Sequence, residues 1–189
     1  MPYLRNLPPH GAVFDVFGAY PDLFGPIVDF SDRVFRGPGP LPTRDREMIF
    51  AYCSDLNRCH YCHGGHAQTS LLLGAPKDVF EKLRVDIDSA PVDAKMKPLL
   101  RYVKKLTETP ARITRADADA VYAAGWGDDE LMQAIALCCI ANFMNRLVEG
   151  AGIEADPAKF MARAETATKL GYKKPFEMKM AERAKAAAK

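Results

Sequence analysis

The sequence predicts a single domain built from α-helices. Apolar residues recur at spacings of three and four along most of the 189-residue chain, which is the spacing of one helix face. Alternating runs of Val, Ile and Thr, which are typical of strands, are missing. Breaks that contain Pro and Gly separate the periodic segments. The 48% apolar content is enough for one sizeable core.

The first 20 residues are rich in Pro and Gly, and we expect them to form an arm on the surface or on a partner subunit. A first helix is predicted over residues 22–35, and Pro26 is expected to kink it or delay its start. Residues 37–42, which are mostly Gly and Pro, are expected to form a loop that ends this helix. The apolar face of this helix consists of Leu23, Ile27, Phe30 and Val34.

A second helix is predicted over residues 44–56, with Thr43 as its cap. Its apolar stripe leaves Glu47 on the opposite, polar side, so this pattern alone indicates a solvated surface carboxylate. A short turn over residues 55–58 leads into a third helix, which ends at Gly74, a residue suited to a left-handed stop. The stripe of the second helix consists of Met48, Ile49, Tyr52, Cys53 and Leu56.

The longest predicted helix covers residues 128–150 and is apolar on nearly all sides, so we expect it to lie in the core or in a subunit interface. Its vicinal Cys138 and Cys139 are interpreted as buried residues that take no part in the chemistry. Its polar residues Asn142, Asn145 and Arg146 line the thiol pocket, hold an interface by hydrogen bonds, or satisfy nearby backbone carbonyls, and these alternatives stay open. The other predicted helices cover residues 76–83, 94–107, 115–124, 157–170 and the charged tail 173–189.

Composition excludes several classes of function. The net charge of +2 gives no reason to expect binding to nucleic acid or to an anionic membrane surface. The N-terminal residues lack the apolar core of a secretory signal, and no run reaches the roughly 18 apolar residues of a membrane span. We therefore expect a cytoplasmic protein, in which a C-x-x-C pair is more often redox-active or metal-binding than structural.

The chemistry concentrates at the start of the third helix, in the run CHYCHGGH over residues 59–66. On a helix, Cys59, Cys62, His63 and His66 fall at offsets 0, 3, 4 and 7, all on one face. Each cysteine has a histidine four residues later, close enough for contact. A neighbouring imidazolium and a helix N-terminus both lower a thiol pKa. The pattern therefore indicates thiol redox chemistry, with a lowered thiol pKa as one expectation.

Three other interpretations of this run remain open. The segment matches the C-x-x-C-H haem attachment signature, although such proteins are exported. The same four side chains are also zinc-ligand types, but four ligands on two helical turns would crowd the metal and no second ligand pair is evident. Finally, the cysteines can be small buried residues and the histidines solvated ones. Neither a metal nor a cofactor is expected.

The run resembles the core of alkyl hydroperoxidase D (AhpD) and its peroxidase-related relatives, in the carboxymuconolactone decarboxylase-like superfamily. The likeness rests on Glu47, the pair Cys59-x-x-Cys62, and His66 four residues after the second cysteine. It covers about 28 residues strongly and about 120 more by their helix pattern. The resemblance implies an all-α helical bundle of the AhpD type and a homo-oligomer built on trimers or hexamers.

Residue by residue, the resemblance implies that Cys62 meets the peroxide and Cys59 resolves it into a disulfide. It implies further that His66 polarises Cys62, and that Glu47 orients His66 or relays a proton. Well-studied members have a histidine where this chain has Tyr61, which bears on peroxidase efficiency. His63 and Tyr61 are auxiliary candidates, because His63 is spaced to meet Cys59 and to assist reduction of the disulfide.

We therefore expect one domain over residues 1–189, with an arm (1–20), a redox core (43–155) and a tail helix (173–189). The expected activity is reduction of a hydroperoxide substrate by a Cys59–Cys62 dithiol, which an external dithiol protein re-reduces. Two alternatives stay open. One is a carboxymuconolactone decarboxylase-like lyase on the same scaffold, and the other is a non-catalytic thiol redox sensor.

Overall fold

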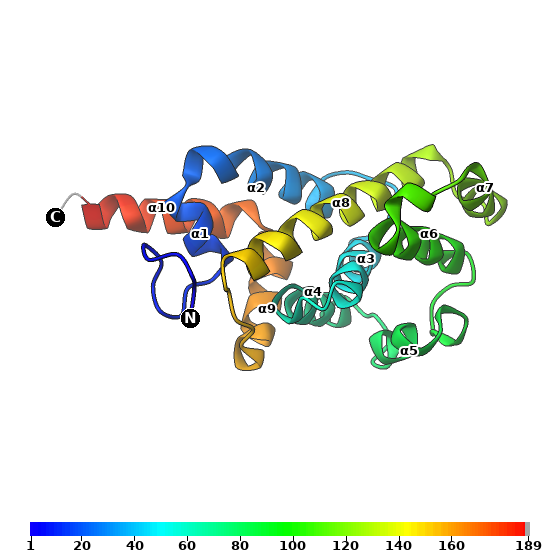
Figure 1. Ribbon diagram of the computed structural model, residues 1–189, viewed down its shortest axis with the longest axis horizontal. Coiled ribbons are helices and arrows are strands. Elements are labelled where there is room, and N and C mark those ends of the chain that lie inside the picture. Colours follow the sequence, from blue (N-terminus) through cyan, green and yellow to red (C-terminus); the bar gives the residue numbers. More distant parts are fainter. Residues whose placement is uncertain (188–189) are drawn as a thin grey trace.

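The computed structural model describes residues 1–187, and within that range it is all-α, as predicted (Figure 1). Short 3-10 turns occur at Ile87–Ser89, Pro110–Arg112 and Pro157–Lys159. Residues 188–189, the end of the predicted tail helix, lie outside the described range. The helices are α1 (Val13–Ala19), α2 (Pro21–Arg36), α3 (Thr43–Leu56), α4 (His60–Leu72), α5 (Val79–Val85), α6 (Met96–Glu108), α7 (Arg115–Ala123), α8 (Asp128–Gly150), α9 (Phe160–Leu170) and α10 (Lys173–Ala187).

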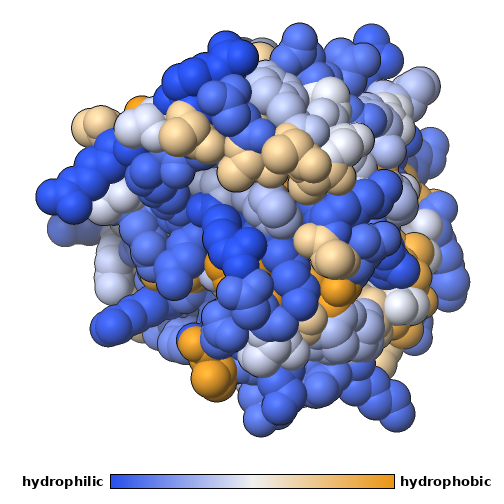
Figure 2. Space-filling model, turned by 90° about the vertical axis from the view of Figure 1, so that its right-hand side faces the viewer, coloured by the Kyte–Doolittle hydropathy of each residue, from blue (hydrophilic) through white to orange (hydrophobic). Residues whose placement is uncertain are grey.

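Helix α3 lies at the centre of the fold. All ten of its residues from Asp45 to Ser54 are buried, because α4, α6, α8 and α2 pack around it. Helix α8 runs diagonally across the molecule, with α2 and α10 toward one end and α6 and α7 toward the other (Figure 1). The surface at the α5–α7 end is mostly hydrophilic, with small separate apolar groups (Figure 2).

The expectation that residues 1–20 form only an arm was incomplete. Residues 13–19 form the helix α1, which buries Val16 and Phe17 and contacts α2 and α10. The amide of Tyr3 also donates a hydrogen bond of 2.9 Å to the carbonyl of Ala151. The N-terminal segment is therefore part of the same packed unit and closes one side of it.

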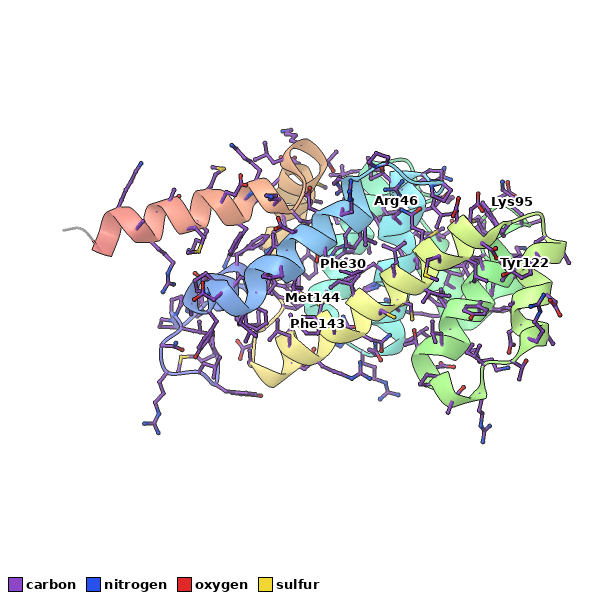
Figure 3. The ribbon with its side chains drawn as sticks, turned by 90° about the horizontal axis from the view of Figure 1, so that it is seen from above. Phe30, Arg46, Lys95, Tyr122, Phe143 and Met144 are labelled. Carbon is purple, nitrogen blue, oxygen red and sulfur yellow. The ribbon has the colours of Figure 1, made fainter. Side chains whose placement is uncertain are left out.

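The turn between α2 and α3 is held by a buried arginine that the helix pattern does not single out. Arg46 is 4% exposed, and its guanidinium donates to the carbonyls of Leu41 (2.6 Å), Gly37 (2.7 Å) and Gly39 (3.0 Å). A loop rich in Pro has few backbone donors of its own, so one side chain satisfies several carbonyls. Arg46 thereby fixes where α3 begins (Figure 3).

Two glycines shape α4. Gly74 has φ +93°, so it ends the helix in the left-handed region as predicted. Gly64 allows α9 to approach, because a Cβ atom there would lie 2.0 Å from Cε2 of Phe160. Arg58, just before the helix, also has a positive φ of 58° and turns the chain from α3 into α4. These features place the cysteine-containing end of α4 beside α3, α8 and α9.

Helix α8 is long and apolar enough to cross a membrane by length and composition alone. In the fold it is a core helix, since it packs against α2, α3, α4 and α6. Its burial is not complete, however. Phe143 is 40% exposed, and Phe30 on the adjacent α2 is 44% exposed (Figure 3). The prediction that both vicinal cysteines are buried holds for Cys138 but was wrong for Cys139, which is exposed.

Candidate active site

Glu47 is completely buried, at 0% exposure. The helix-wheel interpretation of a solvated carboxylate was therefore wrong. The apolar stripe takes into account only the residues of α3 itself. In the fold, the polar side of α3 is covered by α4 and by the C-terminal segment. Burial alone would raise the pKa of Glu47, but the charge and hydrogen bond of His66 and then of Arg36 outweigh it and hold the pKa below its ordinary value.

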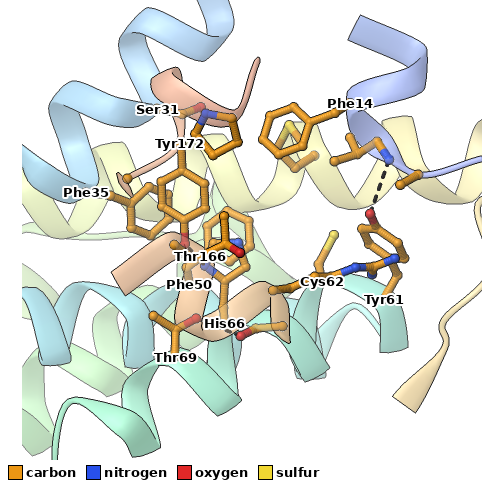
Figure 4. Close-up of a pocket in the computed structure, with 18 of the residues that line it drawn as sticks. Phe14, Ser31, Phe35, Phe50, Tyr61, Cys62, His66, Thr69, Thr166 and Tyr172 are labelled. Carbon is orange, nitrogen blue, oxygen red and sulfur yellow. Dashed lines mark hydrogen bonds between the residues drawn. The ribbon is translucent and has the colours of Figure 1, made fainter. Parts of the chain in front are cut away.

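His66 forms a short contact with Glu47. Its Nδ1 lies 2.6 Å from Oε2 of Glu47, which fixes the tautomer with the proton on Nδ1. Its ring packs against Phe50, at 3.9 Å between centroids, and Phe35, at 5.0 Å. Among residues 1–187 no side chain bonds to Nε2, and His66 lines a pocket (Figure 4). Nε2 is therefore the nitrogen that can exchange a proton there.

Two further partners of Glu47 were not found by sequence reasoning. Arg36, at the end of α2, lies 2.6 Å from Oε1 of Glu47. Tyr172, just before α10, donates its hydroxyl to the same carboxylate at 2.9 and 3.0 Å. Its ring stacks on His66 with centroids 5.4 Å apart. No local signal marks these residues, because they come from segments 11 and 125 positions away from Glu47 in the chain.

The two cysteines of the C-x-x-C pair lie together at the N-terminus of α4. Cys59 is the N-cap and is 0% exposed, while Cys62 is 5% exposed and faces the pocket. A hydrogen bond with Cys59, followed by burial, raises the pKa of Cys62 well above its ordinary value. A hydrogen bond from Asn145 of α8 acts in the opposite direction. The dithiol is thus in place, next to the pocket that His66 also lines.

The expected lowering of the thiol pKa was wrong for Cys62, whose pKa is raised. His66 is spaced to meet Cys62, but its Nδ1 is bound to Glu47 instead. A second thiol in contact and a buried surrounding both favour the neutral form of Cys62. The helix N-terminus contributes only about 0.3–1 kcal/mol, which is too little to reverse them. Cys62 therefore needs a base to become a nucleophile.

His63 does not reach Cys59, which corrects the second predicted cysteine–histidine pair. Its Nδ1 lies 3.0 Å from the carbonyl oxygen of Ala51, and its Nε2 lies 3.0 Å from Nη2 of Arg84. Burial lowers the pKa of His63. The rings of His63 and His66 therefore turn to different partners, and the two cysteines and two histidines do not converge on one point as zinc ligands do.

Tyr61 ties the helices around the pocket together. Its hydroxyl accepts a hydrogen bond of 3.2 Å from the amide of Val13 in α1 (Figure 4). Its ring carries the guanidinium of Arg163 from α9, with 4.4 Å between the guanidinium carbon and the ring centroid. Burial raises its pKa, so the hydroxyl stays protonated. In this fold the tyrosine is a wall of the pocket.

A second thiol pair lies behind the first. Cys53 of α3 and Cys138 of α8 are hydrogen-bonded to each other, and Thr107 Oγ1 lies 3.2 Å from the sulfur of Cys138. These bonds, with a further one from Asn142, lower the pKa of Cys138 to about 7 against the effect of burial. Cys138 is thus held by polar contacts within the core.

The polar residues of α8 connect the two thiol pairs. The side-chain amide of Asn57 donates to Asn142 at 3.1 Å and to Asn145 at 2.9 Å. Asn142 also bonds to Cys138, and Asn145 bonds to Ser54 and lowers the pKa of the nearby Cys62. None of the three polar residues predicted on α8 lines the pocket. Asn142 and Arg146 donate to backbone carbonyls of α8, which was one of the expected roles, and Asn145 lies in the network beside Cys62.

The pocket has a volume of about 420 Å³. Its wall is mainly aromatic and aliphatic, and it includes Cys62, His66 and the Tyr172 ring that stacks on His66 (Figure 4). A cavity of this size and lining accepts a small organic molecule with an apolar body. The apolar wall includes Phe14, Phe17, Phe35, Phe50, Ile140 and Met144.

Comparison with solved structures decides the fold. A peroxidase-related protein from a Silicibacter species superimposes with a TM-score of 0.73 at 22% identity, over 80% of this chain and 79% of its own. The AhpD core of a peroxidase-related protein from Ralstonia eutropha gives 0.72 at 22% identity, over 79% and 78%. The chain has the AhpD-type fold. No protein-family model and no curated protein matches it in sequence.

A third structure extends the likeness. An Agrobacterium tumefaciens protein of unknown function, described with reference to the antioxidant defence protein AhpD, gives a TM-score of 0.63 at 21% identity. It is covered over 95% of its length, against 75% of this chain. The AhpD-type fold predicted from the cysteine run is therefore confirmed.

Proposed function

We propose that this protein is a thiol-dependent hydroperoxide reductase that uses Cys62 and Cys59 in a dithiol–disulfide cycle. The observation that carries the proposal is a shared pocket. Cys62 and His66 both line it, and Cys59 stands behind Cys62 in hydrogen-bonded contact. A substrate in the pocket thus meets a nucleophile and a base, and the resolving thiol waits beside the nucleophile.

In the first step, Nε2 of His66 takes the proton from the thiol of Cys62. The thiolate attacks the terminal oxygen of the hydroperoxide, so an S–O bond forms and the O–O bond breaks. The alkoxide takes a proton from His66 and leaves as the alcohol, and Cys62 becomes a sulfenic acid. A base is needed here because the raised pKa keeps Cys62 protonated near neutral pH.

In the second step, the sulfur of Cys59 attacks the sulfur of Cys62. The S–S bond forms, the S–O bond breaks, and the hydroxyl leaves as water with the proton of Cys59. An external dithiol protein then reduces this disulfide by thiol–disulfide exchange and is itself oxidised. The two thiols are restored, and one hydroperoxide has been converted into one alcohol and one water.

Glu47 acts as a positioning residue in this scheme. Its carboxylate holds the proton of His66 on Nδ1, so that Nε2 stays available as the base, and it stabilises the imidazolium that forms. Arg36 balances the buried charge of Glu47, and Tyr172 restricts the carboxylate from its other side. We propose in addition that the protein works in the cytoplasm as a homo-oligomer, with the exposed Phe30 and Phe143 in the subunit contact.

The proposal is tested by treating the reduced protein with one equivalent of an alkyl hydroperoxide, titrating free thiols and mapping the product by mass spectrometry. We expect loss of two thiols and a Cys59–Cys62 disulfide. Cys62→Ser should abolish consumption, and Cys59→Ser should accumulate a sulfenic acid at Cys62. Cys139→Ser, at the exposed cysteine of α8, is the matched control and should behave as wild type. A sulfenic acid on Cys59 in the Cys62→Ser protein would reverse the two roles.

A further inference from the structure

The α9 wall of the pocket carries an arginine without a protein partner for one of its nitrogens. Nη1 of Arg163 is buried and has no hydrogen-bond partner among residues 1–187. The guanidinium rests on the ring of Tyr61, at 4.4 Å from the centroid, and Arg163 lines the pocket beside Cys62. A buried guanidinium nitrogen left unbonded is costly, and a carboxylate would satisfy it with a charge-assisted bond.

Two carboxylates near this part of the pocket are bound to other cations. Asp156 lies close enough for Arg163 to affect its charge, but Lys159 holds it at 3.0 Å. Asp15 of α1 is held by Lys179 at 2.8 Å. Lys159 also lines the pocket, yet its charge is matched by Asp156. Nη1 of Arg163 has no partner among residues 1–187, so the charge of Arg163 is available to an anionic group of a ligand.

The rest of the cavity favours an apolar body for that ligand. Phe14 of α1, Phe35 of α2 and Phe50 of α3 all line the cavity and together form its phenylalanine wall (Figure 4). Hydrogen peroxide is far too small to fill about 420 Å³. The cavity thus combines the positive charge of Arg163 and an apolar wall with the thiol of Cys62 and the imidazole of His66.

We propose that the pocket binds an organic hydroperoxide that carries one carboxylate, with the carboxylate on Arg163 and the apolar body against the phenylalanine wall. This inference deepens the proposed function and names its substrate class. The carboxylate anchors the molecule at α9, and its hydroperoxide then reaches Cys62 and His66. Arg163 is a specificity-determining residue in this arrangement, because a neutral hydroperoxide leaves its Nη1 without a partner.

The test measures binding rather than turnover, so that it stands apart from the peroxidase proposal. Octanoate and 1-octanol share an apolar chain and differ in charge. Each is titrated calorimetrically into the Cys62→Ser protein, which cannot form the sulfenic acid. We expect octanoate to bind more tightly than 1-octanol. Adding Arg163→Met should weaken octanoate binding about 10-fold or more and leave 1-octanol unchanged, while Arg163→Lys should lose less than Arg163→Met.

Arg112→Met is the matched control, because Arg112 is exposed and lies outside the pocket. It should alter neither affinity. Retained 1-octanol binding by the Arg163→Met protein shows that the cavity is still folded. The inference is overturned if octanoate does not bind, if both ligands bind equally, or if Arg163→Met leaves octanoate affinity unchanged. Arg163-dependent octanoate binding by a protein that consumes no peroxide would instead reject only the proposed function.

Discussion

Nδ1 of His66 lies 2.6 Å from the carboxylate of Glu47, and Glu47 has no exposed surface. This contact determines which imidazole nitrogen faces the pocket. It also couples the chemistry of α4 to a buried charge on α3, which Arg36 and Tyr172 hold from two further elements. The reaction rate, the pH dependence and the stability of the protein therefore all depend on this contact and on the packing around it.

Replacing the carboxylate with an amide should slow the reaction with peroxide. Glu47→Gln keeps the shape of the side chain but removes the charge that holds the proton of His66 on Nδ1. We expect single-turnover oxidation of Cys62, followed by rapid mixing, to slow by about 10- to 100-fold, as for other residues that orient a catalytic histidine. Glu81→Gln on the exposed face of α5 is the control, and equal rates in the two variants would contradict a positioning role.

The same carboxylate should make folding stability sensitive to acid. The pKa of Glu47 is lower in the folded protein than its ordinary value of 4.5, so its contribution is complete above pH 4.5 and is lost as the pH falls through the folded pKa. Urea unfolding at about pH 7 and about pH 3 should show a smaller loss on acidification in Glu47→Gln than in wild type. An identical loss in both proteins would show that Glu47 is not the group that titrates.

Alkylation of Cys62 should report its raised pKa. Because Cys59 is the largest cause of that rise, the alkylation rate in wild type should still increase with pH beyond pH 9. Cys59→Ala removes the neighbouring thiol and should shift the profile of Cys62 to lower pH. Mass mapping separates Cys62 from the other cysteines. A wild-type rate that levels off near neutral pH would contradict the raised pKa.

Removing the hydroxyl of Tyr172 should slow the reaction, whereas removing a comparable hydroxyl at the surface should not. Tyr172→Phe deletes the hydrogen bond to Glu47 and keeps the ring that stacks on His66. We expect a loss of about 1 kcal/mol in the free energy of unfolding and a several-fold slower oxidation of Cys62. Tyr122→Phe deletes a comparable bond to Asp128 at the surface and should leave the rate unchanged. A slower rate in both variants would point to a general effect on stability.

Adjacent glycines of α4 should respond in opposite directions. A Cβ atom at Gly64 would lie 2.0 Å from the ring of Phe160, whereas at Gly65 it would meet nothing within 4 Å. Gly64→Ala should therefore destabilise the protein by about 1–3 kcal/mol through overpacking. Gly65→Ala should stabilise it by about 0.5–1 kcal/mol through helix propensity. Thermal unfolding measures the stability of both variants. Equal changes in melting temperature would show that α9 moves away from α4 at little cost.

The features of this protein that depend on residues close together in the chain were predictable from the sequence. The helices α3, α4 and α8 follow from apolar spacing and from breaks such as Gly74, because a helix face is set by residues only three or four positions apart. The Cys59–Cys62 pair is local for the same reason. The pairing of His63 with Cys59 failed, although its spacing was right, because Ala51 and Arg84 offer the ring better partners.

An all-helical chain with two cysteines and a histidine at the start of one helix follows from the amino-acid pattern alone, and the likeness to AhpD adds Glu47 to them. The packing of the helices is what brings Arg36 and Tyr172 into the site, keeps Cys62 protonated and places Arg163 on an apolar cavity. These features depend on residues far apart along the chain. Burial and charge at a site are set by segments that meet only when the helices pack, and no periodicity within one segment records them.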